Sequence, residues 1–426
     1  MEPVTSVIMS VYNGEQFLKQ AIESILVQTL PNFEFIIIND GSTDRTGEIL
    51  EHFIDRRIVR INQDHSGLTR ALNRGLLAAR GDYIARIDAD DMAQPDRLEK
   101  QLSFLRNNPD VMLAGSNCHN IDSNGTILST TDFPCENAHI KWRLLFHNCI
   151  PHSSVMFCKD EIMKLGGYDN AITCAQDYDL WLRVAEKYGI ANLKEPLALY
   201  RIPHGDAISH ASAEKQKQMA EQIQRATFKK LHFPLENRWD EVQELCRLLY
   251  FDGTVTNIMA IETLLAQLHN AFCHSAFAAG IKPSALQALK IDPYTKLAWL
   301  YFEAGSREGF NRCIHEILDS GFQGIFQNFR ATTDAEEKFV APALEQYHAG
   351  TSIKAPLRSS NKKLFAHQFR YFAWKYYQAD DIKNFRRCLA RAFFYAPSVK
   401  GFMLLVKSLL GKAAMERIHT IKTALK

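Results

Sequence analysis

The sequence of 426 residues predicts an α/β domain with a mostly parallel sheet, followed by an all-α region. Short apolar segments alternate with helical patterns in the first part of the chain, and polar residues directly follow several of these segments. From Glu214 onward, strand patterns fade and longer helical patterns take over. We therefore expect an α/β domain over residues 1–225 and a helical domain over residues 226–426.

The first elements alternate regularly between strand and helix. The expected strands cover residues 5–11, 33–39, 58–63 and 83–87, and the expected helices cover residues 17–26, 47–53 and 68–79. Ser42 or Thr43 suits the N-cap of the second of these helices. Ligands of a parallel sheet bind beyond the carboxyl ends of its strands, which is where Tyr12, Asp40 and Asp88 fall.

The later elements make the predicted sheet mixed. Strands are expected at residues 111–115 and 151–157, and helices at residues 95–107, at 160–165 and from Gln176 onward. The turn sequence Asp122-Ser123-Asn124-Gly125 marks a hairpin, whose two strands run antiparallel.

Three carboxylates follow the strand at 83–87, in the sequence Asp88-Ala89-Asp90-Asp91. In an extended chain Asp88 and Asp90 point the same way and Asp91 the opposite way, so the first two can share one hard cation. An isolated D-x-D is weak evidence, because acidic loop tips are usually only solvated. Asp91 is expected to lie next to the two ligands without binding the cation directly.

Six segments of the chain follow one another at characteristic spacings. They are VIMSVYNGE (7–15), IINDGSTD (37–44), GLTRALNRG (67–75), GDYIARIDADD (81–91), GGYD (166–169) and QDYDLWLR (176–183). In this order and at these spacings they resemble the motifs of family 2 glycosyltransferases, which have the GT-A fold. The resemblance covers about the first half of the chain and is specific as a set.

The resemblance implies a nucleotide diphosphate sugar as donor, most often a uridine diphosphate (UDP) sugar. Tyr12 would lie against the base, with an aromatic that caps the sheet as the alternative. Asp40 would accept the ring N–H of the base, although from the local sequence alone it reads equally well as a turn residue. Asp88 and Asp90 would hold Mn²⁺ or Mg²⁺ on the phosphates. The implied donor contacts are Ser10, Val11, Tyr12, Asn13, Asp40, Gly67, Arg70, Asn73, Asp88 and Ala89.

The resemblance also implies an inverting reaction with a general base on the acceptor side, for which we choose Asp177, with Asp179 as the alternative. From the helix pattern alone, Asp177 reads equally well as a first-turn acid favoured by the helix dipole. His204 is a candidate metal ligand in the segment that closes the site, and His152 is a weaker one.

The sequence departs from the family pattern at three positions. Gln176 stands where the family often has Glu, which puts any role of a second carboxylate in doubt. Leu72 stands where many members carry Arg, so Arg70 or Arg74 would have to supply a lost cationic contact. Ser10 replaces a frequent Pro, which a strand end tolerates.

Composition predicts a cytoplasmic protein with reduced thiols. The nine cysteines form no C-x-x-C pair, the N-terminus shows no basic and apolar leader, and no apolar segment approaches the length of a bilayer span. The net charge of +2 hides an excess of +13 in residues 351–426. This basic end could rest on an anionic membrane surface or bind a protein, whereas its aromatics read as helix core rather than as a nucleic-acid platform.

The C-terminal half contains an internal match at an offset of 75 residues. AWLYFEAGSREGFNRCI (298–314) aligns without a gap with AWKYYQADDIKNFRRCL (373–389). Such a repeat fits two helix-turn-helix units, as in tetratricopeptide-like solenoids, and a helical bundle of another type is the alternative. In either case we expect the region to bind a partner or position an acceptor.

Together these features predict a metal-dependent inverting glycosyltransferase that acts on a sugar hydroxyl of a surface glycan such as lipopolysaccharide or exopolysaccharide. One alternative is a nucleotidyltransferase that makes the activated sugar, although SVYNGEQ after the first strand lacks the Gly-rich, basic triphosphate loop that it needs. Another is a catalytically inactive binding protein, which the departures at Gln176 and Leu72 leave open.

Overall fold

The computed structural model describes residues 2–202, 210–235, 237–251 and 255–320. The chain packs as two compact units. The first comprises residues 1–246 and 266–282, and the second begins with residues 247–265 and continues from residue 283. The domain boundary expected at residue 225 stays a prediction.

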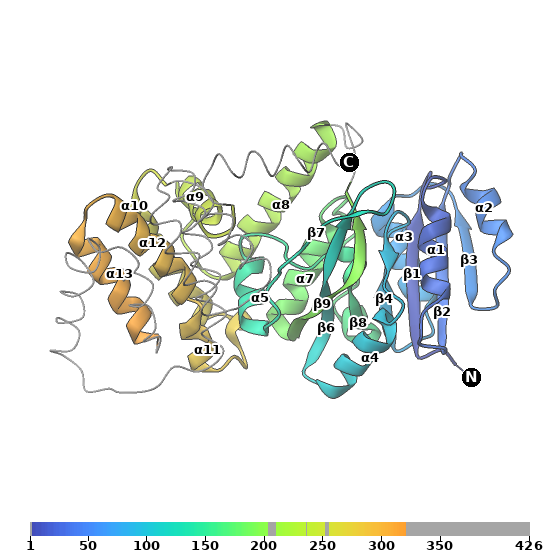
Figure 1. The fold of residues 1–426 in the computed structure, drawn as a ribbon, viewed down its shortest axis with the longest axis horizontal. Helices are drawn as coiled ribbons and strands as arrows, with labels where there is room; N and C mark the ends of the chain where they lie inside the picture. Colours follow the sequence, from blue (N-terminus) through green and yellow to red (C-terminus); the bar gives the residue numbers. More distant parts are fainter. Residues whose placement is uncertain (1, 203–209, 236, 252–254, 321–426) are drawn as a thin grey trace, which may run out of the picture. The chain divides into compact units, whose positions relative to one another are not determined.

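The first unit is built on a nine-stranded mixed sheet with the order β3-β2-β1-β4-β8-β6-β9-β5, with β7 beside β6 (Figure 1). Strands β1 to β4 are parallel, β8 runs antiparallel to β4 and β6, and β9 runs parallel to β6. The strands are β1 Thr5–Val11, β2 Phe33–Asp40, β3 Ile58–Gln63, β4 Tyr83–Arg86, β5 Met92–Ala93, β6 Val111–Ile121, β7 Ile127–Thr130, β8 Met156–Cys158 and β9 Gly189–Arg201.

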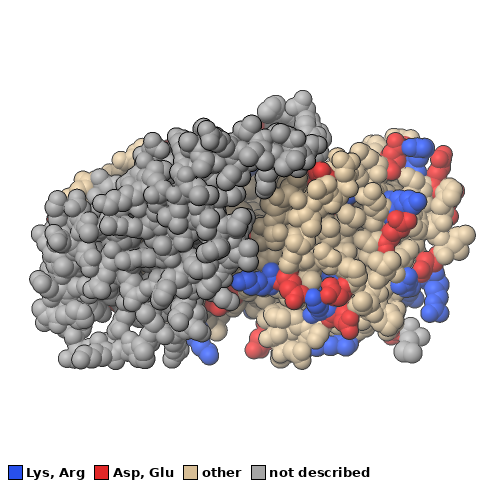
Figure 2. Space-filling view, in the orientation of Figure 1, with Lys and Arg blue, Asp and Glu red and all other residues tan. Residues whose placement is uncertain are grey.

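Helices follow most of these strands. In the first unit they are α1 Leu18–Leu26, α2 Thr46–His52, α3 Leu68–Ala78, α4 Arg97–Asn107, α5 Asn137–Leu144, α6 Lys159–Lys164, α7 Gln176–Lys187 and α8 His210–Lys230. Two helices cross the borders between the units, α9 Trp239–Tyr250 and α10 Ile258–Cys273. Figure 2 shows acidic and basic side chains interspersed on the visible face of the first unit.

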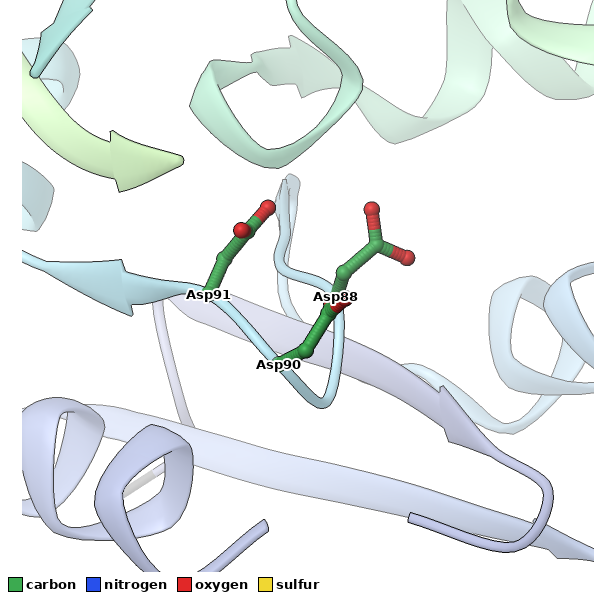
Figure 3. Close-up of side chains that lie close together, drawn as sticks. All are labelled: Asp88, Asp90 and Asp91. Carbon is green, nitrogen blue, oxygen red and sulfur yellow. The ribbon is translucent and has the colours of Figure 1, made fainter. Parts of the chain in front are cut away.

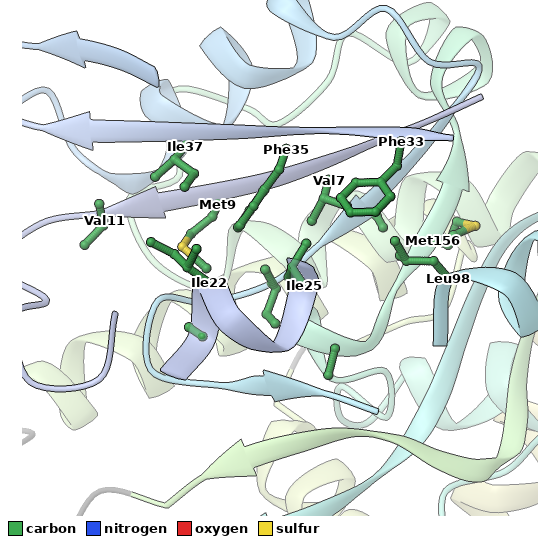
Figure 4. Close-up of a cluster of buried hydrophobic side chains, with 14 of the residues drawn as sticks. Val7, Met9, Val11, Ile22, Ile25, Phe33, Phe35, Ile37, Leu98 and Met156 are labelled. Atoms are coloured by element: carbon green, nitrogen blue, oxygen red, sulfur yellow. The ribbon is translucent and has the colours of Figure 1, made fainter. Parts of the chain in front are cut away.

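Helices cover both faces of β1 and β2, which explains why these strands are apolar without alternation. Val7 and Met9 pack with Ile22 and Ile25 of α1 on one face (Figure 4). On the other face, a Cβ at Gly75 of α3 would come within 2.7 Å of Ile8, so α3 approaches the sheet too closely for a larger residue. The parallel strands of this packed sheet have their carboxyl ends at the same edge.

Two local expectations were wrong, and one long strand was missed. Helix α2 begins at Thr46 rather than after Ser42 or Thr43, because Asp44 accepts the backbone N–H of Thr46 (3.0 Å) and Ser42 instead accepts that of Asn13 (3.0 Å). Residues 151–157 contain a 3₁₀ turn, His152–Ser154, before the short strand β8. Strand β9 was not expected at all.

The described part of the second unit is helical. Helix α11 covers Pro283–Ala288, and α12 Ile291–Glu303 and α13 Arg307–Asp319 form a helix-turn-helix with Gly305 in the left-handed region (φ 69°). This pair contains the first copy of the internal repeat. The second copy at 373–389 and the basic segment 351–426 lie outside the described residues. None of the described helices has the length and apolar character of a membrane span.

Candidate active site

Asp88, Asp90 and Asp91 lie in a turn at the carboxyl end of β4 (Figure 3). The backbone N–H of Asp91 donates to the carbonyl of Asp88 (3.4 Å), so the chain reverses here. The expectation of an extended segment with Asp91 on the opposite side was therefore wrong. Figure 3 shows the side chains of Asp88 and Asp91 on the same side of the turn, and one carboxylate oxygen from each of the three residues lies within 4.8 Å of the others.

Two side chains, those of Arg86 and Ser153, hold the carboxylate of Asp88. Arg86, whose side chain is buried, donates both Nη groups to the two carboxylate oxygens of Asp88. The hydroxyl of Ser153 donates to Asp88 Oδ2 (3.0 Å) and accepts the backbone N–H of Asp88 (3.1 Å). A buried guanidinium thus compensates part of the negative charge of the aspartate turn.

Asp91 is nearly completely buried, at 1% exposure. Its Oδ1 accepts the backbone N–H of Arg201 (2.7 Å), whereas its Oδ2 has no hydrogen-bond partner. Burial, together with the charges of Asp88 and Asp90, raises the pKa of Asp91 to about 8. A buried carboxylate oxygen without a partner, close to two further carboxylates, is the environment that a hard divalent cation satisfies, so these residues fit Mn²⁺ or Mg²⁺.

The raised pKa of Asp91 predicts a pH-dependent stability of the metal-free protein. Asp91 ionises near pH 4 when unfolded and near pH 8 when folded, so its contribution to the free energy of unfolding falls as the pH rises between these values. Urea unfolding in the presence of a chelator measures this slope. The Asp91→Asn variant should show a shallower fall than the wild-type protein, and equal slopes would contradict the burial of an ionisable group here.

Asp177 lies in the first turn of α7, directly after Ala175 and Gln176. Ala175 is in the left-handed region (φ 56°), which turns the chain sharply into the helix. Enclosure by the protein raises the pKa of Asp177, and this is opposed by the Tyr178 backbone and by Arg86. Asn148 donates its side-chain N–H to Asp177 Oδ2 (2.9 Å).

Asp88 of the aspartate turn and Asp177 line one cavity of about 620 Å³, together with Arg86, Tyr200 and other residues, whereas Asp90 and Asp91 are absent from its described lining. This volume accommodates a medium-sized organic ligand. Asp179, the alternative base, is absent from the described lining and forms an ion pair with Arg183 (2.7 Å). The arrangement offers a cluster of carboxylates that can hold a cation beside the cavity and a second carboxylate, Asp177, in the cavity that can accept a proton.

Comparison with known proteins assigns the chain to a family. The model "Glycosyl transferase family 2" matches residues 6–162. The chain is 35% identical over 259 residues to the uncharacterized glycosyltransferase MJ1057 of Methanocaldococcus jannaschii. This aligned region covers 59% of this chain and 84% of MJ1057. This chain belongs to glycosyltransferase family 2.

Two further relatives carry more specific names. The Escherichia coli O-antigen biosynthesis glycosyltransferase WbnJ is 36% identical over 203 residues, 46% of this chain and 79% of WbnJ. The Erwinia amylovora amylovoran biosynthesis glycosyltransferase AmsE is 32% identical over 203 residues, 46% of this chain and 75% of AmsE. Family membership decides against the nucleotidyltransferase alternative, and the mixed sheet with its flanking helices is the GT-A fold of the family.

A solved structure aligns more distantly. Staphylococcus aureus TarS 1–349 in complex with UDP-GlcNAc aligns with a TM-score of 0.47 and 16% identity, over 75% of this chain and 92% of that one.

At the expected nucleobase end of the glycosyltransferase site, Tyr12 is 48% exposed and its ring stacks on that of His65 (4.0 Å between centroids). Asp40 is buried, and its carboxylate accepts hydrogen bonds from Gln63 Nε2 (2.6 Å) and from the backbone N–H groups of Ser66 (2.9 Å) and Gly67 (2.9 Å). In this arrangement Asp40 shapes the loop between β3 and α3. Its bond to a base ring N–H stays a prediction.

The other predicted donor contacts are spread over the loops around this end. The side-chain amide of Asn73 donates its Nδ2 to the carbonyl of Tyr168 (2.7 Å), and its Oδ1 accepts the backbone N–H of Tyr168 (3.0 Å). Asn73 therefore holds the Gly166–Asp169 segment against α3. Arg70 is exposed on α3, and Arg74 donates to Gln63 Oε1 (3.0 Å). Ser10 and Val11 are the last two residues of β1. Asn13 is in the left-handed region (φ 51°), and its side-chain oxygen accepts the backbone N–H of Thr43 (2.8 Å). Gly67 (φ 91°) directly precedes α3, and Ala89 lies in the aspartate turn.

The two histidine candidates have different outcomes. His204 lies outside the described residues. His152 lines the cavity and its Nε2 lies 2.8 Å from the hydroxyl of Tyr168, and it is not part of the aspartate cluster. Burial and the charge of Arg86 hold the pKa of His152 well below its ordinary value, so the ring is neutral.

Several residues of the site were missed from the sequence. Arg86 could have been predicted from the sequence, because a single cationic residue in an otherwise apolar, buried strand needs a buried partner of opposite charge. Ser153, Asn148 and His65 are single polar residues in loops or short turns, and their distance in sequence from Asp88, Asp177 and Tyr12 gives no pattern to read.

Proposed function

We propose that this family 2 glycosyltransferase is a metal-dependent inverting enzyme. It moves a hexosyl or N-acetylhexosaminyl group from a UDP-linked donor to a hydroxyl of a glycan or glycolipid acceptor. The observation that carries the proposal is the single cavity shared by Asp88 and Asp177. The names of WbnJ and AmsE support an acceptor that belongs to a surface polysaccharide or lipopolysaccharide.

At the donor end, Asp88, Asp90 and Asp91 would hold Mn²⁺ or Mg²⁺. Such an ion neutralises the charge that builds up on the departing diphosphate. Arg86 and Ser153 keep the Asp88 carboxylate in place, and the backbone of Arg201 orients Asp91.

At the acceptor end, Asp177 removes the proton from the attacking hydroxyl. The acceptor oxygen forms a bond to the anomeric carbon while the bond from that carbon to the phosphate oxygen breaks, and the nucleoside diphosphate leaves with the electron pair. Attack from the face opposite the leaving group inverts the configuration. Asp177 lies beyond the matched residues 6–162, so its role rests on its place in the cavity.

A thermal-shift panel of nucleotide diphosphate sugars, each with and without Mn²⁺, tests the donor assignment. A ligand that binds only the folded state raises the melting temperature, and at equal concentration a tighter ligand raises it more. UDP sugars with Mn²⁺ should give the largest rise, and the Asp88→Asn variant should lose most of it. If no UDP compound gives a metal-dependent rise, the donor proposal is wrong.

A further inference from the structure

Asn148 is in a position to control the proposed base. It follows α5 in a loop and lines the same cavity as Asp177 and Asp88. We propose that Asn148 is a positioning residue, which holds Oδ2 of Asp177 so that the carboxylate presents a fixed face to the acceptor hydroxyl. This inference rests on the proposed function, in which Asp177 is the base.

The orientation of the Asn148 amide follows from its two hydrogen bonds. Its Oδ1 accepts the backbone N–H of Ile150 (3.1 Å), so the NH₂ group points away from that N–H. This NH₂ group donates to Asp177 Oδ2 (2.9 Å). Rotating the amide by 180° would set its oxygen against the carboxylate and its NH₂ against another donor, so only the observed orientation is favourable.

The loop that carries Asn148 is itself fixed from two sides. Trp181 Nε1 donates to the carbonyl of Ile150 (3.3 Å), and Asn192 Nδ2 donates to that of Cys149 (3.1 Å). Both side chains are buried. Trp181 lies one turn after Asp177 on α7, so one helix holds both the base and the loop that orients it.

The hydrogen bond also affects the charge of the base. Enclosure disfavours the ionised carboxylate, and a donor to that carboxylate favours it. The other charged or titratable groups that act on Asp177 are Arg86 and Asp88 from the end of β4, Tyr168, and Tyr200 of β9. Burial raises the pKa of both tyrosines, to about 12 for Tyr200, so they remain neutral while Asp177 titrates.

Asn148→Ala is expected to lower kcat about 10- to 100-fold, the effect of losing a hydrogen bond to a charged group, with little change in donor KM. The acid limb of the pH profile should move about one pH unit upward, because the ionised base is less stable. Asn148→Asp should move it further, because two carboxylates then face each other. The assay is the release of UDP from UDP-glucose, UDP-galactose and UDP-N-acetylglucosamine in the presence of Mn²⁺, with water replacing the acceptor.

Asn120→Ala is the matched control. Asn120 lines the same cavity, but its amide donates to Ser129 Oγ (2.8 Å) and not to Asp177. The acid limb of the pH profile of Asn120→Ala should therefore match that of the wild-type protein. Melting temperatures show that each variant is folded. An unchanged acid limb in both Asn148 variants, with Asp177→Asn inactive, would overturn the positioning role alone. Wild-type turnover in Asp177→Asn would overturn the base assignment and the role of Asn148 with it.

Discussion

The Asp177→Asn variant is expected to bind the donor like the wild-type protein and to turn it over about 10²- to 10⁴-fold more slowly. Asn has the shape of Asp, and its amide oxygen can still accept the hydrogen bond from Asn148, but it cannot take a proton from the acceptor. The loss should therefore appear in kcat rather than in donor KM. The rate of nucleoside diphosphate release measures turnover, and the donor-induced thermal shift measures donor binding.

Asp179→Asn is the control for this prediction. It removes a carboxylate two residues along the same helix, one that pairs with Arg183 and is absent from the described cavity lining. Its turnover should stay near that of the wild type. The opposite pattern, with Asp179→Asn inactive and Asp177→Asn active, would mean that the alternative base is the correct one. Wild-type turnover in both variants would remove the need for a carboxylate base on α7.

Arg86→Met is expected to destabilise the metal-free protein by about 3–5 kcal/mol, the effect of removing one partner of a buried ion pair. Arg86 is the buried cation that faces Asp88, and Asp90 and Asp91 lie beside it. Without Arg86 the charge of the Asp88 carboxylate has no buried counter-charge in this partly buried turn. Urea unfolding in the presence of a chelator measures the loss.

Mn²⁺ should restore much of this stability, and more in Arg86→Met than in the wild type, because the ion replaces the missing positive charge. Arg45→Met is the control, since Arg45 is exposed and pairs with Glu15 at the surface (3.2 Å), where such pairs contribute about 0–1 kcal/mol. If Mn²⁺ stabilises Arg86→Met no more than the wild type, the aspartate turn is not the metal site.

The parallel half of the fold could be predicted because its physical cause is local. Strands β1 and β2 are covered on both faces, so burial requires continuous apolar segments, and these end at the polar loops that the sequence places there. Strand β9 has no such pattern. Its buried and exposed residues do not alternate, and its pairing with β6 shifts register more than once, so neither period 2 nor a continuous apolar segment marks it.

The candidate residues were predictable where a local sequence pattern marks them, at a strand end or in the first turn of a helix, and not where tertiary contacts decide. Asp88 and Asp177 were found as candidates, and the structure brings both to one cavity. The place of Asp91 was missed because the alternation rule holds for extended chain and the segment is a turn. Asn148 reaches Asp177 across 29 residues of sequence, through a contact that only the packing of α7 against the loop creates.

The most direct test of the account is the anomalous scattering of Mn²⁺ in crystals of the full chain grown with UDP. The account predicts one strong peak within coordination distance of the Asp88, Asp90 and Asp91 carboxylates, with the diphosphate in the cavity that Asp177 lines. A peak elsewhere, or a diphosphate in a space that Asp177 does not reach, would contradict the shared site of donor and base.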